Sequence, residues 1–362
     1  HIKQDAETLQ QHNQKDIVLL NSAFSLIKNK LAWNGYKSKY PTASLSKAYK
    51  DGGGNCADIN LNLIILLREL GFDAFPVILS TQENGIIHPA HPSISRFNYV
   101  IAMVKVDNDT LLMDATDPYS EINLLPIRCL NDKGRIVNNT SGDWITLMDF
   151  KPYSIVETYD LEINNSLEIN GTNQMKLKDY ASYLLKKEIK KHNNIDEYKA
   201  SIEKRTKDYK IYKLEVSGLD TIQDDMKISI NFSQNNFIEQ SNEISFFTPA
   251  YQPFISENPF KLEKRDYPVE FNYPFTLQQI YTIRIPENYT ISEVPEPLMA
   301  RTPDGKMKYI YNINQLGDKI TLSLMFSRSK TLFLPEEYQG LKEFYQMMVD
   351  KQKELVVLKK VQ

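Results

Sequence analysis

The sequence predicts an α+β protein, because helical and strand-like periodicities occupy separate stretches of its 362 residues. Residues 1–150 begin with apolar residues at helical spacing and continue with the short alternating runs of an antiparallel sheet. Residues 151–362 are predicted to form a mostly-β, sandwich-like domain. Within that domain we expect a long helix near 175–207 and a C-terminal helix near 335–358.

Helices are expected first along the chain. Residues 6–31 place apolar side chains at helical spacing. A short helix over residues 44–50 has Ser44 in position to serve as its N-cap. The next helix starts at Cys56, after a run of three glycines. It ends at Gly71, which suits the left-handed conformation that follows a last helical turn.

A β-hairpin is expected over residues 97–116, after a strand over 72–79. A two-residue turn in this hairpin places Tyr99 opposite Thr116, with Asp114 as its diagonal neighbour on the same face. The other face is then uniformly apolar, which favours this register over a three-residue turn. The register therefore brings Tyr99 and Asp114 together.

Strands are also expected in the second domain, over residues 154–163 and through most of 209–329. One hairpin is predicted over residues 306–328, with its turn at Gly317. The terminal helix is predicted to begin at Pro335, since proline is favoured in a first helical turn.

Composition argues against several classes of function. A net charge of −3 leaves no basic surface for nucleic acid, so we expect no such partner. The longest apolar run, residues 61–67, is too short to span a membrane. The sequence contains no phosphate-binding loop or dinucleotide motif, and its two cysteines, Cys56 and Cys129, lack the spacing of a zinc site. We therefore expect no cofactor and no metal.

Cys56 is the candidate nucleophile. The unpaired N–H groups at a helix N-terminus favour a thiolate, the reactive form of cysteine, and supply donors for an oxyanion. A cysteine hydrolase further needs a base and a group that orients the base. Asp114 is suited to the orienting role, whereas Cys129 has no comparable setting and is interpreted as structural.

Four separated motifs carry a resemblance to a known family. In order they are Gly54-Asn55-Cys56-Ala57-Asp58, Leu66-Leu67-Arg68-Glu69-Leu70-Gly71-Phe72-Asp73-Ala74, Phe97-Asn98-Tyr99-Val100 and Asp114-Ala115-Thr116. Together they resemble the bacterial transglutaminase-like core, which is a papain-like Cys-His-Asp fold. The resemblance covers roughly residues 15–120. It implies that Cys56 is the nucleophile and Asp114 the aspartate of a catalytic triad.

Tyr99 occupies the position of the family's histidine. Tyrosine has a pKa near 10 and is a poor base at neutral pH, so the triad is expected to be impaired. His88 and His91, in the loop before the strand, are candidate surrogate bases; the alternative is that they are solvated loop residues. Tyr99 is alternatively a core aromatic residue whose hydroxyl bonds to Asp114.

Three further residues are expected near the cleft, namely Trp33, Asn55 and Asn98. Packing in the core is the alternative for Trp33.

The remainder of the chain resembles a β-rich module of unknown function that follows this core in many exported bacterial proteins. The matching motifs are Arg265-Asp266-Tyr267-Pro268-Val269, Ile285-Pro286-Glu287-Asn288-Tyr289 and Val294-Pro295. The resemblance implies an exported protein, periplasmic or at the cell surface.

Two functions follow as hypotheses. The first is a thiol hydrolase or acyltransferase that acts on peptide or amide bonds through Cys56 and is impaired because Tyr99 replaces the catalytic histidine. The second is an inactive relative that serves as a peptide- or protein-binding module. Either function has a peptide or protein as its partner.

Overall fold

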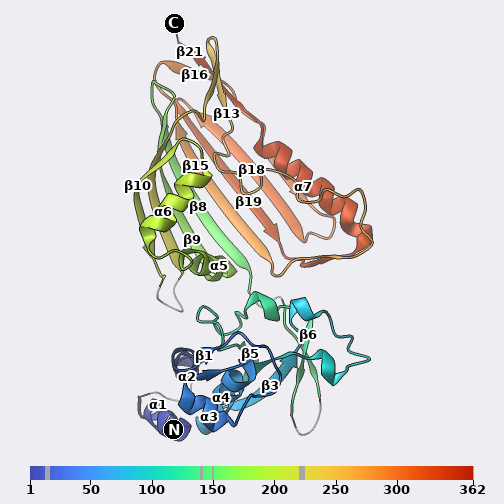
Figure 1. Ribbon diagram of the computed structural model, residues 1–362. Coiled ribbons are helices and arrows are strands. Elements are labelled where there is room, and N and C mark those ends of the chain that lie inside the picture. The colour runs from blue at the N-terminus through green and yellow to red at the C-terminus, as the bar shows by residue number, and fades with distance from the viewer. Residues whose placement is uncertain (13–16, 139–141, 149–150, 220–224, 362) are drawn as a thin grey trace. The chain divides into compact units, whose positions relative to one another are not determined.

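The computed structural model describes all residues except 13–16, 139–141, 149–150, 220–224 and 362. The described residues form two compact units, His1–Lys151 and Pro152–Gln362 (Figure 1). Strand residues outnumber helix residues, and a helix lies near the C-terminus. The predicted α+β class is confirmed.

The first unit packs helices against one side of an antiparallel sheet. Its helices are α1 (Ile2–His12), α2 (Ile17–Lys30), α3 (Leu45–Asp51) and α4 (Cys56–Glu69), and its strands are β1 (Ala32–Trp33), β2 (Gly53–Gly54), β3 (Asp73–Leu79), β4 (Tyr99–Val106), β5 (Asp109–Met113), β6 (Lys133–Ile136) and β7 (Trp144–Thr146). The main sheet has the order β5-β4-β3-β6-β7. Helix α4 packs on β3 and β4, and α1, α2 and α3 pack on α4.

The helical stretch expected over residues 6–31 consists of α1 and α2. An ion pair of 2.5 Å between Asp5 and Lys30 shows that α1 folds back on α2. Residues 13–16 of the predicted helix lie outside the described residues.

Helix α4 begins and ends where the sequence predicts. The side chain of Asn55 accepts a hydrogen bond from the Asp58 N–H, and the Asp58 carboxylate accepts one from the Asn55 N–H, each at 2.9 Å. This capping box fixes Cys56 as the first helical residue. The chain leaves the helix through Gly71, which has a φ of 83°.

The predicted hairpin register is confirmed. Strands β4 and β5 pair antiparallel from Val106 opposite Asp109 to Ala102 opposite Met113. The face of the hairpin that carries Ala102 and Met113 belongs to the hydrophobic core beneath α4. The register therefore places Tyr99 and Asp114 on the other face.

The second unit is built on a large sheet. Its elements are β8 (Tyr153–Ile163), β9 (Ile169–Asp179), α5 (Tyr180–Ile189), α6 (Ile195–Arg205), β10 (Tyr209–Ser217), β11 (Met226–Gln234), β12 (Glu239–Ser241), β13 (Ile244–Phe247), β14 (Val269–Glu270), β15 (Phe275–Arg284), β16 (Tyr289–Glu293), β17 (Leu298–Arg301), β18 (Met307–Leu316), β19 (Lys319–Arg328), β20 (Leu332–Phe333), α7 (Tyr338–Gln352) and β21 (Val356–Lys360). The large sheet has the order β10-β11-β9-β8-β15-β19-β18-β17, and β8 and β15 run parallel.

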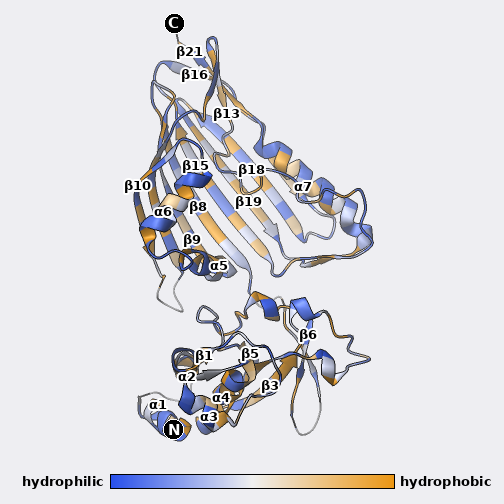
Figure 2. Cartoon of the chain, in the orientation of Figure 1, coloured by the Kyte–Doolittle hydropathy of each residue, from blue (hydrophilic) through white to orange (hydrophobic). Residues whose placement is uncertain are grey.

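One face of this sheet is buried. Hydrophobic and polar residues alternate along its strands (Figure 2). In β8, for example, Ile155, Tyr159 and Leu161 are buried, whereas Val156 and Asp160 are exposed. This period of two is that of a sheet with one solvated face.

The layer over the buried face differs from that of a sandwich of two large sheets. The ring centroid of Phe326 in β19 lies 5.4 Å from that of Phe254, in a connecting segment, and 5.9 Å from that of Tyr345 in α7. Val356 and Leu358 of a smaller sheet, β12-β13-β21-β16, belong to the same core. Helix α7, a long connection and the small sheet thus replace the expected second large sheet.

The prediction of a long helix near 175–207 is wrong. Met175 and Leu177 lie in β9, which pairs with β8 on one side and β11 on the other. Two shorter helices, α5 and α6, follow. Asn194 interrupts the helical stretch because its side chain caps α6, accepting a hydrogen bond from the Glu197 N–H at 2.9 Å.

The terminal helix also ends earlier than predicted. Helix α7 stops at Gln352, and β21 occupies Val356–Lys360. Val356 and Leu358, two residues apart in this strand, are both buried in the core. A buried strand therefore replaces the helix that was expected to continue to residue 358. The hairpin expected over 306–328 is present as β18 and β19. Of the helices described, none is both long and apolar enough to cross a membrane.

Candidate functional site

The glycine run before Cys56 permits a close approach of two chain segments. Gly52 ends α3 with a φ of 81°. Strand β2 pairs parallel with β1, and a Cβ on Gly53 would lie 2.5 Å from the Ala32 carbonyl oxygen. A Cβ on Gly54 would lie 2.5 Å from a carboxylate oxygen of Asp58. These contacts require glycine, and they bring the segment after β1 over the start of α4.

That segment, residues 34–43, forms a strap over Cys56. The Cys56 thiol donates to the Ser38 carbonyl at 3.0 Å, and the Ser38 N–H lies 3.3 Å from the Cys56 sulfur. The Asp58 carboxylate accepts from the Thr42 N–H at 3.1 Å and from its hydroxyl at 2.7 Å. The side chain of Asn55 donates to the Tyr40 carbonyl at 2.9 Å. The strap is thus fastened to the N-terminus of α4 at several points.

The Cys56 thiol is fully buried beneath this strap. Burial raises the pKa of the thiol to about 11, although hydrogen bonds from the backbone act in the opposite direction. This rise in pKa acts against the thiolate that the sequence predicts at the N-terminus of α4. Loss of solvation is the largest cause of the rise, and it favours the protonated thiol at neutral pH.

Tyr99 and Asp114 meet as the hairpin register predicts. The Tyr99 hydroxyl donates to Asp114 Oδ2 at 2.9 Å and lies 2.8 Å from the Thr116 hydroxyl. Asp114 Oδ1 accepts from Asn60 Nδ2 at 2.9 Å and from the Thr116 N–H at 3.0 Å. Burial, with the nearby Asp114 charge, raises the pKa of Tyr99 well above its usual value. The phenol is a neutral hydrogen-bonding group here.

Arg128 completes the cluster, and sequence reasoning missed it. Its Nε donates to the Tyr99 hydroxyl at 3.1 Å, and Nη2 donates to Asp114 Oδ2 at 3.3 Å. Nη1 lies 3.7 Å from a carboxylate oxygen of Asp117. The guanidinium carbon lies 4.4 Å from the ring centroid of Trp33. Burial acts to lower the pKa of Arg128, but the Asp114 carboxylate raises it, and the guanidinium stays charged.

The two loop histidines are placed elsewhere. His88 and His91 are exposed, and their rings stack with centroids 5.9 Å apart. The His88 Nδ1 accepts from the Ala90 N–H at 3.3 Å. Cys56 and Asp114 are buried, so the structure does not bring either histidine into their cluster.

The remaining predicted residues lie around the cluster, and some of them contact it. Asn98 binds Thr81 through both its side-chain atoms, at 2.9 Å each, and so fixes the start of β4. Trp33 donates from Nε1 to the Tyr36 carbonyl at 3.0 Å. Cys129 is buried, with its sulfur 3.6 Å from Asp114 Oδ2. In the described residues, no cluster of three or more His, Cys, Asp or Glu side chains could hold a metal ion.

Comparisons with known proteins address the fold. A family described as a domain of unknown function with a solved structure, DUF3858, matches residues 242–358. The search of curated proteins gave no match. The chain is similar to the crystal structure of a protein from Parabacteroides distasonis described as a "putative protease", with a TM-score of 0.54 and 14% identity. The match covers 99% of this chain and 55% of that one.

The chain thus spans about half the length of that protein. At this identity the likeness shows a shared fold alone. The chain thus shares the fold of a protein described as a "putative protease".

Proposed function

We propose that this chain is a catalytically silent, transglutaminase-like module that binds a peptide or protein instead of cleaving amide bonds. The observation that carries the proposal is the hydrogen bonding of Arg128 to both Tyr99 and Asp114. Thiol hydrolysis needs a group at this place that takes a proton from the cysteine and returns it to the leaving amine. A buried phenol beside a guanidinium does neither at neutral pH.

The state of the cysteine supports the same conclusion. A nucleophilic cysteine needs a low pKa or an adjacent base. The pKa of Cys56 is raised to about 11, and its sulfur is held by the Ser38 backbone. Both halves of an active Cys–base pair are therefore lacking in this conformation.

The surface of the strap supports a binding role. The side chains of Tyr36 and Tyr40 are 74% and 62% exposed, although the strap that carries them is fastened to α4. Exposed tyrosines on a rigid segment are typical of protein contact surfaces, because they bury a large area with little loss of side-chain entropy.

A slow thiol hydrolase or acyltransferase is the second candidate. It is favoured by the position of Cys56 at the N-terminus of α4, where backbone N–H groups can bind an oxyanion. That activity would require displacement of the strap.

The rate of Cys56 alkylation against pH tests the proposal, measured by mass spectrometry with Cys129 as an internal reference. We expect a midpoint near pH 11 and no release of amine from glutamine-containing peptides. A midpoint below about 8.5, together with peptide hydrolysis that Cys56→Ala abolishes, would establish the hydrolase instead.

Replacement of the missing base provides a second test. Tyr99→His restores an imidazole next to Asp114, so we expect the alkylation midpoint to fall relative to the wild type. Tyr99→Phe is the matched control and should leave the midpoint unchanged or higher.

A further inference from the structure

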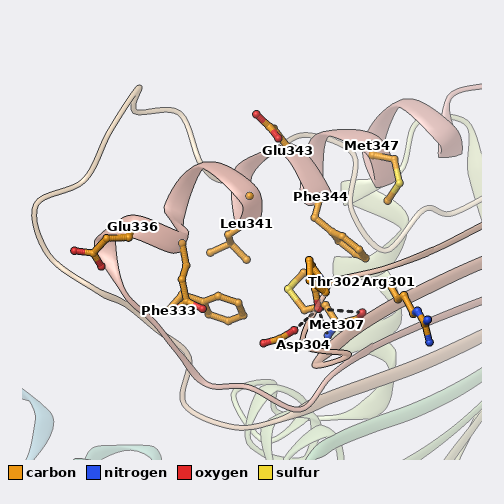
Figure 3. A pocket seen from close by; sticks show the side chains of 13 residues that line it. Arg301, Thr302, Asp304, Met307, Phe333, Glu336, Leu341, Glu343, Phe344 and Met347 are labelled. Atoms are coloured by element: carbon orange, nitrogen blue, oxygen red, sulfur yellow. Dashed lines mark hydrogen bonds between the residues drawn. The ribbon is translucent and has the colours of Figure 1, made fainter.

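A pocket of about 520 Å³ lies in the second unit between α7 and the turn that joins β17 to β18. Phe333, Leu341 and Phe344 converge on Met307, and Met347 lies farther along α7 (Figure 3). This volume is within the usual range for ligand sites. Methionine side chains adapt to partners of different shape. The floor of the pocket therefore fits a bulky apolar group.

The rim of the pocket is acidic. It carries the carboxylates of Asp304, Glu336, Glu337 and Glu343. Glu337 pairs with Lys330. Glu336, in the short turn before α7, and Glu343, which accepts a hydrogen bond from Gln339 at 2.7 Å, are exposed and point outward from the apolar floor (Figure 3). The described lining residues carry one guanidinium, that of Arg301, which points away from Phe333 and Leu341. A cationic partner is electrostatically complementary to this rim.

Gly340 gives independent support for an open pocket. It lies within α7 and lines the pocket, and glycine destabilises a helix relative to alanine. A Cβ at this position would meet no atom within 4 Å, so the packing of the protein does not require glycine here. Its missing side chain leaves the pocket accessible from the side of the helix.

We propose that this pocket binds a peptide segment of another protein, in which a bulky apolar side chain is flanked by lysine or arginine. The apolar side chain fills the space between Phe333 and Phe344, and the flanking cations meet Glu336 and Glu343. This site goes beyond the function proposed for the first unit and does not depend on the state of Cys56.

The test is a fluorescence anisotropy titration of a labelled pentapeptide, one phenylalanine with two lysines on each side, with the full chain. We expect saturable binding. Replacing the phenylalanine by glycine, or the lysines by glutamates, should weaken binding at least about tenfold. Binding that is absent at millimolar protein, or that is equal for the phenylalanine and glycine peptides, would overturn the proposal.

Substitutions at Gly340 locate the site. Gly340→Trp places an indole in the pocket and should weaken binding at least about tenfold, whereas Gly340→Ala should bind like the wild type. Unchanged binding by a folded Gly340→Trp chain would contradict the proposal. Should that variant fail to fold, the surface pair Glu336→Lys and Glu343→Lys gives the same test of the rim.

Sedimentation of the same variants distinguishes a peptide from a second copy of the chain. A wild-type dimer that Gly340→Trp converts to a monomer would show that the pocket is occupied by another copy, and would overturn the proposal. The alkylation of Cys56 should be the same in all Gly340 variants. A failed titration would therefore leave the function proposed for the first unit intact.

Discussion

The guanidinium of Arg128 meets groups that lie far apart in the sequence. It bonds to Tyr99 and Asp114, faces Asp117 and covers the ring of Trp33, while its side chain is 18% exposed. Asp114 itself is fully buried. A buried carboxylate without a cationic partner is strongly unfavourable. Arg128 therefore stabilises the cluster.

Loss of this cation should destabilise the first unit. We expect Arg128→Met to lower the free energy of unfolding by about 3 kcal/mol, because it leaves the Asp114 carboxylate buried without its ion pair. Urea denaturation followed by circular dichroism measures the change. Lys47→Met is the control, because its ion pair with Asp51 is exposed and should contribute less than about 1 kcal/mol. A loss below about 1 kcal/mol for Arg128→Met would contradict this role.

The sequence predicted part of this cluster and not the rest. Hairpin register follows from alternation and turn length, so the meeting of Tyr99 and Asp114 could be derived. Arg128 lies in a short 3₁₀ turn after an irregular stretch. No periodic pattern in such a stretch indicates which way a side chain points. The one usable signal was chemical, since a buried Asp114 requires a nearby cation and Arg128 is the first arginine after it.

At the level of elements, the strap over residues 34–43 covers the buried Cys56. Its attachment depends on the Asp58 carboxylate, which accepts hydrogen bonds from both Thr42 donors and from the Asn55 N–H. Such bonds to a charged acceptor contribute roughly 1.5–3 kcal/mol each. A substitution of Asp58 should therefore lower the free energy of local strap opening more than it lowers the free energy of unfolding of the whole unit.

Removing this attachment should expose the thiol. We expect Asp58→Ala to increase the alkylation rate of Cys56 at pH 8 by at least about tenfold, because the open strap becomes more populated. Asp51→Ala, which removes an exposed carboxylate from α3, should leave the rate unchanged. Equal rates for the two variants would show that the strap is not what protects Cys56.

Helix α7 offers a prediction on stability alone. Gly340→Ala removes a flexible residue from the helix, and its methyl group meets open space. We expect it to raise the free energy of unfolding by about 0.5–1 kcal/mol, as measured by chemical denaturation. A destabilisation would mean that the glycine is needed by the fold, and would remove one argument for the pocket.

The elements that the sequence predicted well are those whose signals are local. Capping at Asn55 and Asp58 and the left-handed Gly71 define both ends of α4. The stretch near 175–207 failed because Met175 and Leu177 fit a helical period as well as an alternating one. Their pairing with β8 and β11 decides between the two, and these strands are distant in sequence.

At the level of the whole molecule, each unit has a hydrophobic core of its own. One core extends from Ala6 to Ala115, and the other from Ile155 to Leu358. A substitution within one core should therefore change the stability of that unit and leave the stability of the other unit unchanged. Hydrogen exchange resolved by mass spectrometry distinguishes the two in the full chain.

The second core contains a carboxyl group that should make its stability depend on pH. Glu157 Oε2 accepts from Gln279 Nε2 at 2.7 Å and from the Tyr159 hydroxyl at 3.2 Å. Burial raises the pKa of Glu157. The folded chain then binds this proton more tightly than the unfolded chain does. The loss of stability that comes from burying the charged carboxylate is absent below the unfolded pKa of about 4.3. It grows as the pH rises towards the pKa of Glu157 in the folded chain.

Glu157→Gln removes this charge and adds a donor. Gln279 Oε1 is buried and has no partner among the described residues, so the new amide can bond to it. We expect the variant to slow hydrogen exchange in residues 152–362 at pH 7, by about 1 kcal/mol of opening free energy. The gain should shrink at pH 4, where Glu157 itself is protonated. Glu162→Gln, on the exposed face of β8, is the control and should have no effect at either pH. A gain that is equal at both pH values would show that charge burial is not its cause.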